Sequence, residues 1–176
     1  MARKTTQTLP HLTEDVARLV DDLARETDRG CALLAAAFVD DVLDVMLRAA
    51  FVDVPDAVNK ILGTGRPLES FGARSHLAYC IGLLGNDVYA DINLIREIRN
   101  DFAHRQPTSF LAKEIDAKCR RLQCVATIMP DEGISPRDRF VATVMMIANH
   151  LLILSEQQSH AVPTKDFAEN GILRVK

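Results

Sequence analysis

The fold class of this chain is decided by the stretch from residue 91 to residue 104, Asp91-Ile92-Asn93-Leu94-Ile95-Arg96-Glu97-Ile98-Arg99-Asn100-Asp101-Phe102-Ala103-His104. Its large apolar residues recur every three or four positions, which is the spacing of one buried face of an α-helix. Polar and charged side chains gather towards the end of the same helix. The stretch therefore predicts a helix that anchors in a core and presents polar chemistry at its carboxyl end.

Signals before this stretch predict further helices. Thr13 followed by two acidic residues is typical of a capped helix start. We expect Asp28-Arg29-Gly30 to interrupt that first helix and a long second one to run from Cys31. Pro55 fits the first turn of a short third helix, because Pro is best tolerated there. A fourth helix is expected from Arg74 to Leu84, closed by Gly85 in a left-handed conformation.

Three more helices are expected after it. Asn86 or Asp87 can cap the helix of the deciding stretch, which must stop by Gln106 because a Pro follows. Thr108 or Ser109 is expected to open a helix that runs to about Cys124. The capping-box motif that begins at Ser135 is expected to start a final helix that runs to about Gln158. No stretch alternates with period two. The prediction is an all-α fold of about seven helices: a flexible tail over 1–10, a single helical domain over 11–158 and an irregular tail over 159–176.

Composition limits the classes of function. The chain has 176 residues, 48% of them hydrophobic and 26% charged, with a formal charge of −3 and no Trp. Such a balance argues against binding nucleic acid through one broad basic surface. Between Arg96 and Arg121 there are seven Lys and Arg against four Asp and Glu, so this segment carries +3 and the remainder −6. We interpret the local excess as a solvated face.

Other signals point to an ordinary cytoplasmic protein. The four Cys residues lie singly within apolar or helical stretches, so we expect reduced core thiols, no metal site and no cofactor. The amino terminus lacks the apolar segment of a secretory signal. The longest apolar run, 140–154, falls short of the roughly 20 residues that span a bilayer, and we expect it to form a buried helix.

Arg99 and His104 carry the first candidate chemistry. They have four residues between them, and this resembles the signature of the HEPN superfamily, whose members are all-α and often dimeric. The resemblance implies a metal-independent endoribonuclease in which the His moves a ribose proton and the Arg steadies the phosphate. The alternatives are structural: Arg99 can pair with Asp28 or another acidic residue, and His104 can cap the last carbonyl groups of its own helix. Asp101 beside them would repel phosphate.

A second resemblance covers residues 20–125 in four blocks. They are Glu26-Thr27-Asp28-Arg29-Gly30, Ala36-Ala37-Phe38-Val39-Asp40-Asp41, Pro67-Leu68-Glu69-Ser70-Phe71-Gly72-Ala73-Arg74 and Ile95 to His104. Their order is similar to that of the mannitol operon repressor family, although Thr27 stands where a Ser is expected. The resemblance implies an all-helical fold and repression of genes for sugar-alcohol uptake and metabolism.

The residues themselves argue against direct DNA binding. A helix-turn-helix reader needs a short turn before an exposed helix rich in base-reading side chains, and we find none. We therefore expect a transcriptional regulator that acts through a protein partner, a transcription factor or another regulator. We also expect that it can form a homodimer and that it makes no membrane contact. The ribonuclease and the direct DNA-binding repressor stay as alternatives.

The remaining candidates are charged residues near apolar segments. Burying such groups is costly unless they pair. Asp28, Arg29, Asp40, Asp41 and Arg74 are therefore expected to form ion pairs between helices. The sharper hypothesis is one polar pocket or partner-binding surface that brings Arg99 and His104 together with polar residues from several segments. The candidate members of this polar cluster are Asp28, Arg29, Arg74, Arg96, Asn100 and Asp101.

Overall fold

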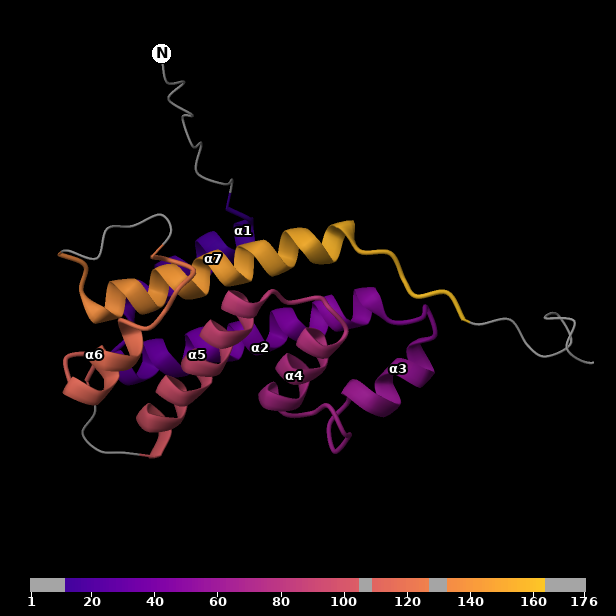
Figure 1. Cartoon of the computed structure of the whole chain (residues 1–176), viewed down its shortest axis with the longest axis horizontal. Helices are drawn as coiled ribbons and strands as arrows, with labels where there is room; N and C mark the ends of the chain where they lie inside the picture. Colours follow the sequence, from indigo (N-terminus) through magenta and orange to yellow (C-terminus); the bar gives the residue numbers. More distant parts are fainter. Residues whose placement is uncertain (1–11, 105–108, 127–132, 164–176) are drawn as a thin grey trace, which may run out of the picture.

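The all-α prediction is confirmed. The computed structural model describes residues 12–104, 109–126 and 133–163, and within them it contains helices and no strand. The helices are α1 (Glu14–Arg25), α2 (Asp28–Ala50), α3 (Pro55–Leu62), α4 (Phe71–Cys80), α5 (Asn86–His104), α6 (Lys113–Cys119) and α7 (Pro136–Gln157). Figure 1 shows α7 lying along α2, with α4 and α5 on another side of α2 and α3 near its carboxyl end.

α2 is the central helix of the bundle, because it packs against α1, α4, α5 and α7. Its buried residues are small or aliphatic, and Ala32, Ala35 and Ala36 let neighbouring helices approach closely. An aromatic group from three segments fills one end of the core: the ring centroids of Phe102 and Phe110 lie 4.9 Å apart, and those of Phe110 and Phe140 lie 5.2 Å apart. The apolar face predicted for the deciding stretch is the face that α5 buries.

The break between α1 and α2 is shorter than the sequence predicted. Thr13 caps α1 as expected, since its hydroxyl accepts a hydrogen bond from the Val16 N–H. The prediction that Asp28-Arg29-Gly30 interrupts the helix is wrong. Thr27 caps α2 through the Gly30 N–H at 3.1 Å, so these three residues form the first turn of α2. The prediction overlooked Thr27 as a cap.

α4 begins earlier and ends earlier than expected. The Ser70 hydroxyl accepts from the Ala73 N–H at 3.1 Å and starts the helix at Phe71 instead of Arg74. The left-handed residue after the helix is Gly82, with φ of 79°, and not Gly85. Tyr79 of α4, before this turn, stacks on Tyr89 of α5, after it, with ring centroids 4.2 Å apart and planes 7° from parallel.

The helix predicted from residue 108 or 109 to Cys124 is much shorter, because α6 covers only Lys113–Cys119. Contacts from distant residues hold the segments on either side of it in turns. Before α6, the Ser109 hydroxyl and the Phe110 N–H both donate to Asp28. After α6, the fully buried carboxylate of Asp91 accepts from the N–H groups of Gln123 and Cys124 at 2.8–3.0 Å.

α7 agrees with its prediction. The Ser135 hydroxyl accepts from the Asp138 N–H at 3.1 Å and donates to the Asp138 carboxylate at 2.6 Å, so the capping signal of the sequence is real. By length and composition alone, α7 is the one helix among the described residues that can cross a membrane. It packs instead against α2, α1 and α6, and one face of it is buried in the core. Its buried Asn149 accepts from the Thr13 N–H at 2.8 Å and so holds the start of α1.

The two predicted tails lie mostly outside the described residues. These exclude residues 1–11 and 164–176, so the predicted flexible tail over 1–10 stays a prediction. Residues 158–163 form no helix. This short segment contacts the end of α2, where the Ala161 N–H donates to the Ala50 carbonyl at 3.1 Å and the His160 ring lies 2.8 Å from the Phe51 carbonyl.

Candidate functional site

Arg99 and His104 are both exposed at the carboxyl end of α5. The Arg99 guanidinium donates to the Asn100 side chain at 3.1 Å, and His104 has no hydrogen-bond partner among the described residues. The structure therefore contains neither an ion pair between Arg99 and Asp28 nor a cap of α5 by His104. Five positions along a helix turn a side chain by roughly 140°, so the two groups leave α5 on different sides. Within one chain, α5 does not aim them at a common point.

Arg29 joins the first turn of α2 to the end of α5. Its guanidinium donates to the Ala103 carbonyl at 3.0 Å. Carbonyl groups in the last turn of a helix lack partners within the helix and carry the negative end of its dipole, so a cation is favourable there. Arg29 therefore caps the carboxyl end of α5, a role that the sequence predicted for His104.

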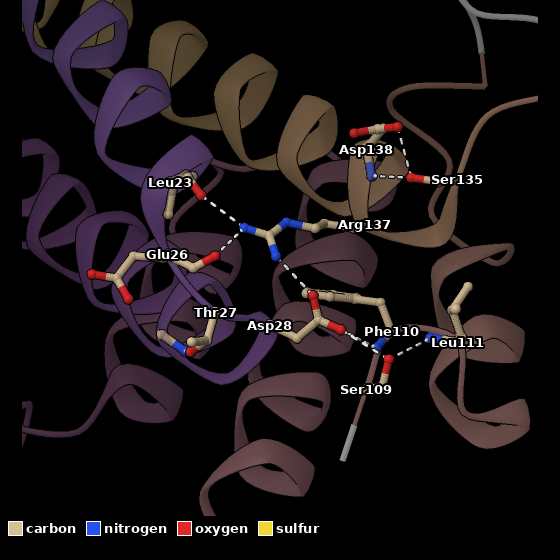
Figure 2. A network of polar contacts seen from close by, with 11 residues as sticks. Leu23, Glu26, Thr27, Asp28, Ser109, Phe110, Leu111, Ser135, Arg137 and Asp138 are labelled. Carbon is tan, nitrogen blue, oxygen red and sulfur yellow. Dashed lines mark hydrogen bonds and ion pairs between the residues drawn. The ribbon is translucent and has the colours of Figure 1, made fainter.

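Asp28, the neighbour of Arg29, lies in a network that reaches four segments. Figure 2 shows Arg137 of α7 pointing between the Asp28 carboxylate and the carbonyl groups of Leu23 and Glu26. The three distances are 2.7, 2.9 and 2.5 Å. The other oxygen of Asp28 accepts from the Ser109 hydroxyl at 2.9 Å and from the Phe110 N–H at 3.1 Å. The network ties α1, α2 and α7 to the segment before α6.

The Asp28 network sets the pKa of this carboxyl group. Burial acts to raise the pKa, but the hydrogen bonds from Phe110, Ser109 and Arg137, with the charge of Arg137, lower it below its ordinary value of 3.8. Asp28 thus stays ionised at neutral pH. The sequence singled out Asp28 but not Arg137, because their contact joins residues 109 positions apart.

A stability measurement against pH checks this pKa. A carboxyl group whose pKa is lower in the folded state stabilises the fold above its unfolded pKa, and this stabilisation is lost as the pH falls through the folded pKa. We expect the urea midpoint of the wild type to fall more steeply than that of Asp28→Asn as the pH drops from about 5 to below 3.8. Parallel pH profiles for the two proteins would contradict the assignment.

Asp101 is paired and does not face solvent as a free charge. Lys118 of α6 donates to it at 2.7 Å and lies 3.3 Å from Glu97. Burial acts to lower the pKa of Lys118, but the hydrogen bonds to the two carboxylates raise it above its ordinary value of 10.5. These ion pairs join α5 to α6 and neutralise one of the cations in the basic segment from Arg96 to Arg121.

Arg96 leaves α5 towards α4. Its guanidinium donates to Asn93 at 2.8 Å and lies 6.0 Å from the centre of the Phe71 ring. Gly72 is buried beneath it, and a Cβ atom there would come within 2.5 Å of the Arg96 side chain. The Phe71-Gly72 pair of the third sequence block thus makes room for Arg96.

Arg74 belongs to another place in the fold. It donates to Asp40 at 2.6 Å and lies 3.4 Å from Asp44, so it joins α4 to the middle of α2. Asp28 and Asp40 are twelve positions apart on α2, which corresponds to about 18 Å along the helix. The structure therefore divides the predicted cluster: Arg29 contacts the end of α5, Asp28 beside it binds the segment before α6, and Arg74 lies elsewhere. Among the ion pairs expected between helices, that of Arg74 with Asp40 is present, whereas Asp41 pairs with no described residue.

A hollow of about 400 Å³ opens beside Arg74. It is lined by Asp41, Asp44, Val45 and Arg48 of α2, by Leu62 of α3, by Gly63, Thr64 and Glu69 of the following loop and by Arg74. Arg48 donates to Asp44 at 2.5 Å and to Asn59 at 2.8 Å. Burial raises the pKa of Asp40 above 3.8, and the charges of Asp41 and Asp44 add to this against the effect of Arg74. Four carboxyl groups against two guanidinium groups leave negative charge in excess here.

The cysteines offer no activated thiol in the core. Burial raises the pKa of Cys31 to about 11 and those of Cys119 and Cys124 to about 12. All four thiols are free, as expected, but Cys80 is exposed and is not the core thiol that the sequence predicted. No group of three His, Cys, Asp or Glu side chains placed to hold a metal ion occurs in the described segments.

Comparisons with known proteins assign the chain to a family. A family model described as "Mannitol repressor" matches residues 15–160. A solved structure, the "X-ray structure of the MtlR-HPr complex from Escherichia coli", contains a chain with the same fold at a TM-score of 0.69 and 19% sequence identity, and the match covers 79% of this chain and 99% of that one. No curated protein matches. Because the family model spans most of the sequence and all four sequence blocks lie within it, this chain belongs to the mannitol repressor family.

Proposed function

We propose that this protein regulates genes of mannitol metabolism in the cytoplasm by binding another protein rather than DNA. The family match over residues 15–160 supports the regulated pathway. The observation that carries the mode of action is the likeness to a chain of the Escherichia coli MtlR-HPr complex, a relative that was solved with a protein partner. By this likeness, HPr is the partner to test first.

The charges of α5 and α6 support a protein partner over nucleic acid. Binding to a phosphate backbone needs cations that are free to replace counterions. On this surface Lys118 is bound to two carboxylates, and Arg120 lies 3.0 Å from Asp116. α6 has only seven residues, which gives about two turns to lie in a groove. Direct repression through this region is therefore disfavoured.

Calorimetric titration of this protein with HPr tests the proposal. We expect saturable binding with micromolar or tighter affinity, and we expect no preference for mannitol-operon DNA over random DNA in a mobility shift at low salt. Binding of operator DNA with clear preference, and none of HPr, would reverse the assignment. Sedimentation of the protein alone, at the same concentrations, separates HPr binding from association of two copies.

RNA cleavage is a second candidate, because Arg99 and His104 are both exposed at the end of α5. A second copy of the chain would have to complete such a site, since one helix directs the two side chains apart. Incubation with mixed RNA in EDTA decides the matter when the protein is compared with Arg99→Ala and His104→Ala. Cleavage that both variants lose supports the enzyme, and equal cleavage by all three proteins removes these residues from catalysis.

A further inference from the structure

The central helix α2 has one side that no other described helix covers. Four residues spaced three or four apart form this outer stripe, and all are exposed: Leu34, Ala37, Asp41 and Val45. Leu34 and Val45 are 38% and 48% exposed. The opposite face of the same helix contributes nine buried residues to the core. An apolar stripe on the helix that organises a bundle is a common mark of an interaction surface.

The charged hollow described above opens on this stripe, since Asp41 and Val45 belong to both. Four acidic residues lie in or next to it, Asp40, Asp41, Asp44 and Glu69, against two basic ones, Arg48 and Arg74. Both Arg side chains already donate to carboxylates of α2. Asp41 has no ion pair or hydrogen bond to any residue in the described part of the chain. The hollow therefore offers an unpaired carboxylate and a net negative field next to apolar side chains.

We propose that the outer stripe of α2 and its adjoining hollow form the docking surface of this protein, and that its occupant is a partner segment that presents a Lys or Arg beside an apolar side chain. The cation enters the hollow next to Asp41, and the apolar side chain covers Leu34 and Val45. Charge complementarity selects this occupant, because an acidic segment would be repelled by Asp40, Asp41, Asp44 and Glu69. The inference rests on the proposed function, since it assigns the surface through which the protein partner binds.

Titration with HPr tests the surface, with matched substitutions on other helices as controls. Asp41→Lys is expected to weaken HPr binding by about tenfold or more, because it places like charges at a close contact, and Asp41→Asn to weaken it less. Asp22→Lys changes an exposed carboxylate on α1 in the same way and is expected to leave the affinity within about twofold. Val45→Ser is expected to weaken binding by about threefold to tenfold, and Ile81→Ser, at a residue 47% exposed on the α4 side, to leave it unchanged.

Each outcome decides the proposal. Equal affinities for the wild type, Asp41→Lys and Val45→Ser overturn the docking surface and leave the proposed function in place. Failure of HPr to bind the wild-type protein overturns the proposed partner and the surface together. Circular dichroism of each variant shows that a loss of binding comes from a folded protein. Loss of self-association instead of HPr binding in Asp41→Lys assigns the stripe to a second copy of the chain and also overturns the proposal.

Discussion

Asp91→Ala is expected to lower the free energy of unfolding by about 3–5 kcal/mol, the largest effect that we expect from one polar residue of this protein. The Asp91 carboxylate is fully buried and accepts from two main-chain N–H groups, those of Gln123 and Cys124. Alanine leaves both donors without an acceptor in the core and adds a cavity, and each unsatisfied donor costs about 1–3 kcal/mol. Urea unfolding followed by circular dichroism gives the difference.

Asp91→Asn is the matched variant. Its carboxamide keeps the shape and one oxygen acceptor but turns an NH₂ group towards the segment after α6, so we expect a smaller loss of about 1–2 kcal/mol. Substitution of the exposed Asp22 by Ala is expected to change stability by about 0.5 kcal/mol or less. If Asp91→Ala unfolds at the urea midpoint of the wild type, the carboxylate does not hold the chain after α6.

Arg137→Ala is expected to have the second largest effect, a loss of about 3 kcal/mol of unfolding free energy. One guanidinium satisfies the Asp28 carboxylate and the carbonyl groups of Leu23 and Glu26, which lie at the end of α1 and in the turn to α2. Removing it leaves three acceptors without this donor. Arg137→Lys keeps the charge but has a single nitrogen that cannot reach all three, so an intermediate loss is expected.

Arg18→Ala is the control for Arg137. Arg18 is 73% exposed on α1 and pairs with Glu14 within the same helix, so its removal is expected to cost no more than about 0.5 kcal/mol. The pH profile gives an independent result. Because Arg137 helps to keep the pKa of Asp28 low, Arg137→Ala is expected to lose less further stability than the wild type as the pH falls below about 4. A loss of stability equal to that of Arg18→Ala would exclude the network as an anchor of α7.

The sequence predicted those helices whose signals are local. Thr13, Ser135 and the apolar spacing of α5 each act within a few residues. The helices that Thr13 and Ser135 cap begin where expected, and α5 begins at Asn86, slightly before its expected start. It failed where a distant residue supplies the deciding contact. Nothing near Ser109 indicates that its hydroxyl and the next N–H bind Asp28, which lies more than 80 positions earlier and holds this segment out of a helix.

The candidate site shows the same division. The sequence identified Asp28, Arg29 and Arg74 as charged residues that need partners, and the structure supplies a partner for each. It did not separate Arg74 from the other two, because their distance depends on where α4 crosses α2. The outer stripe of α2 was also not predicted. Its members lie between buried residues in a largely apolar helix. Only the packing of the other helices shows which side of α2 stays exposed to solvent.

The stacked pair of Tyr79 and Tyr89 determines what light can report about this protein. The chain contains no Trp and only these two Tyr, so its intrinsic fluorescence comes from one place, the contact between α4 and α5. A change in Tyr emission on unfolding therefore reports the separation of these two helices and does not report on α7. Circular dichroism averages over every helix. Agreement between the two optical signals would demonstrate that the bundle opens as one cooperative unit.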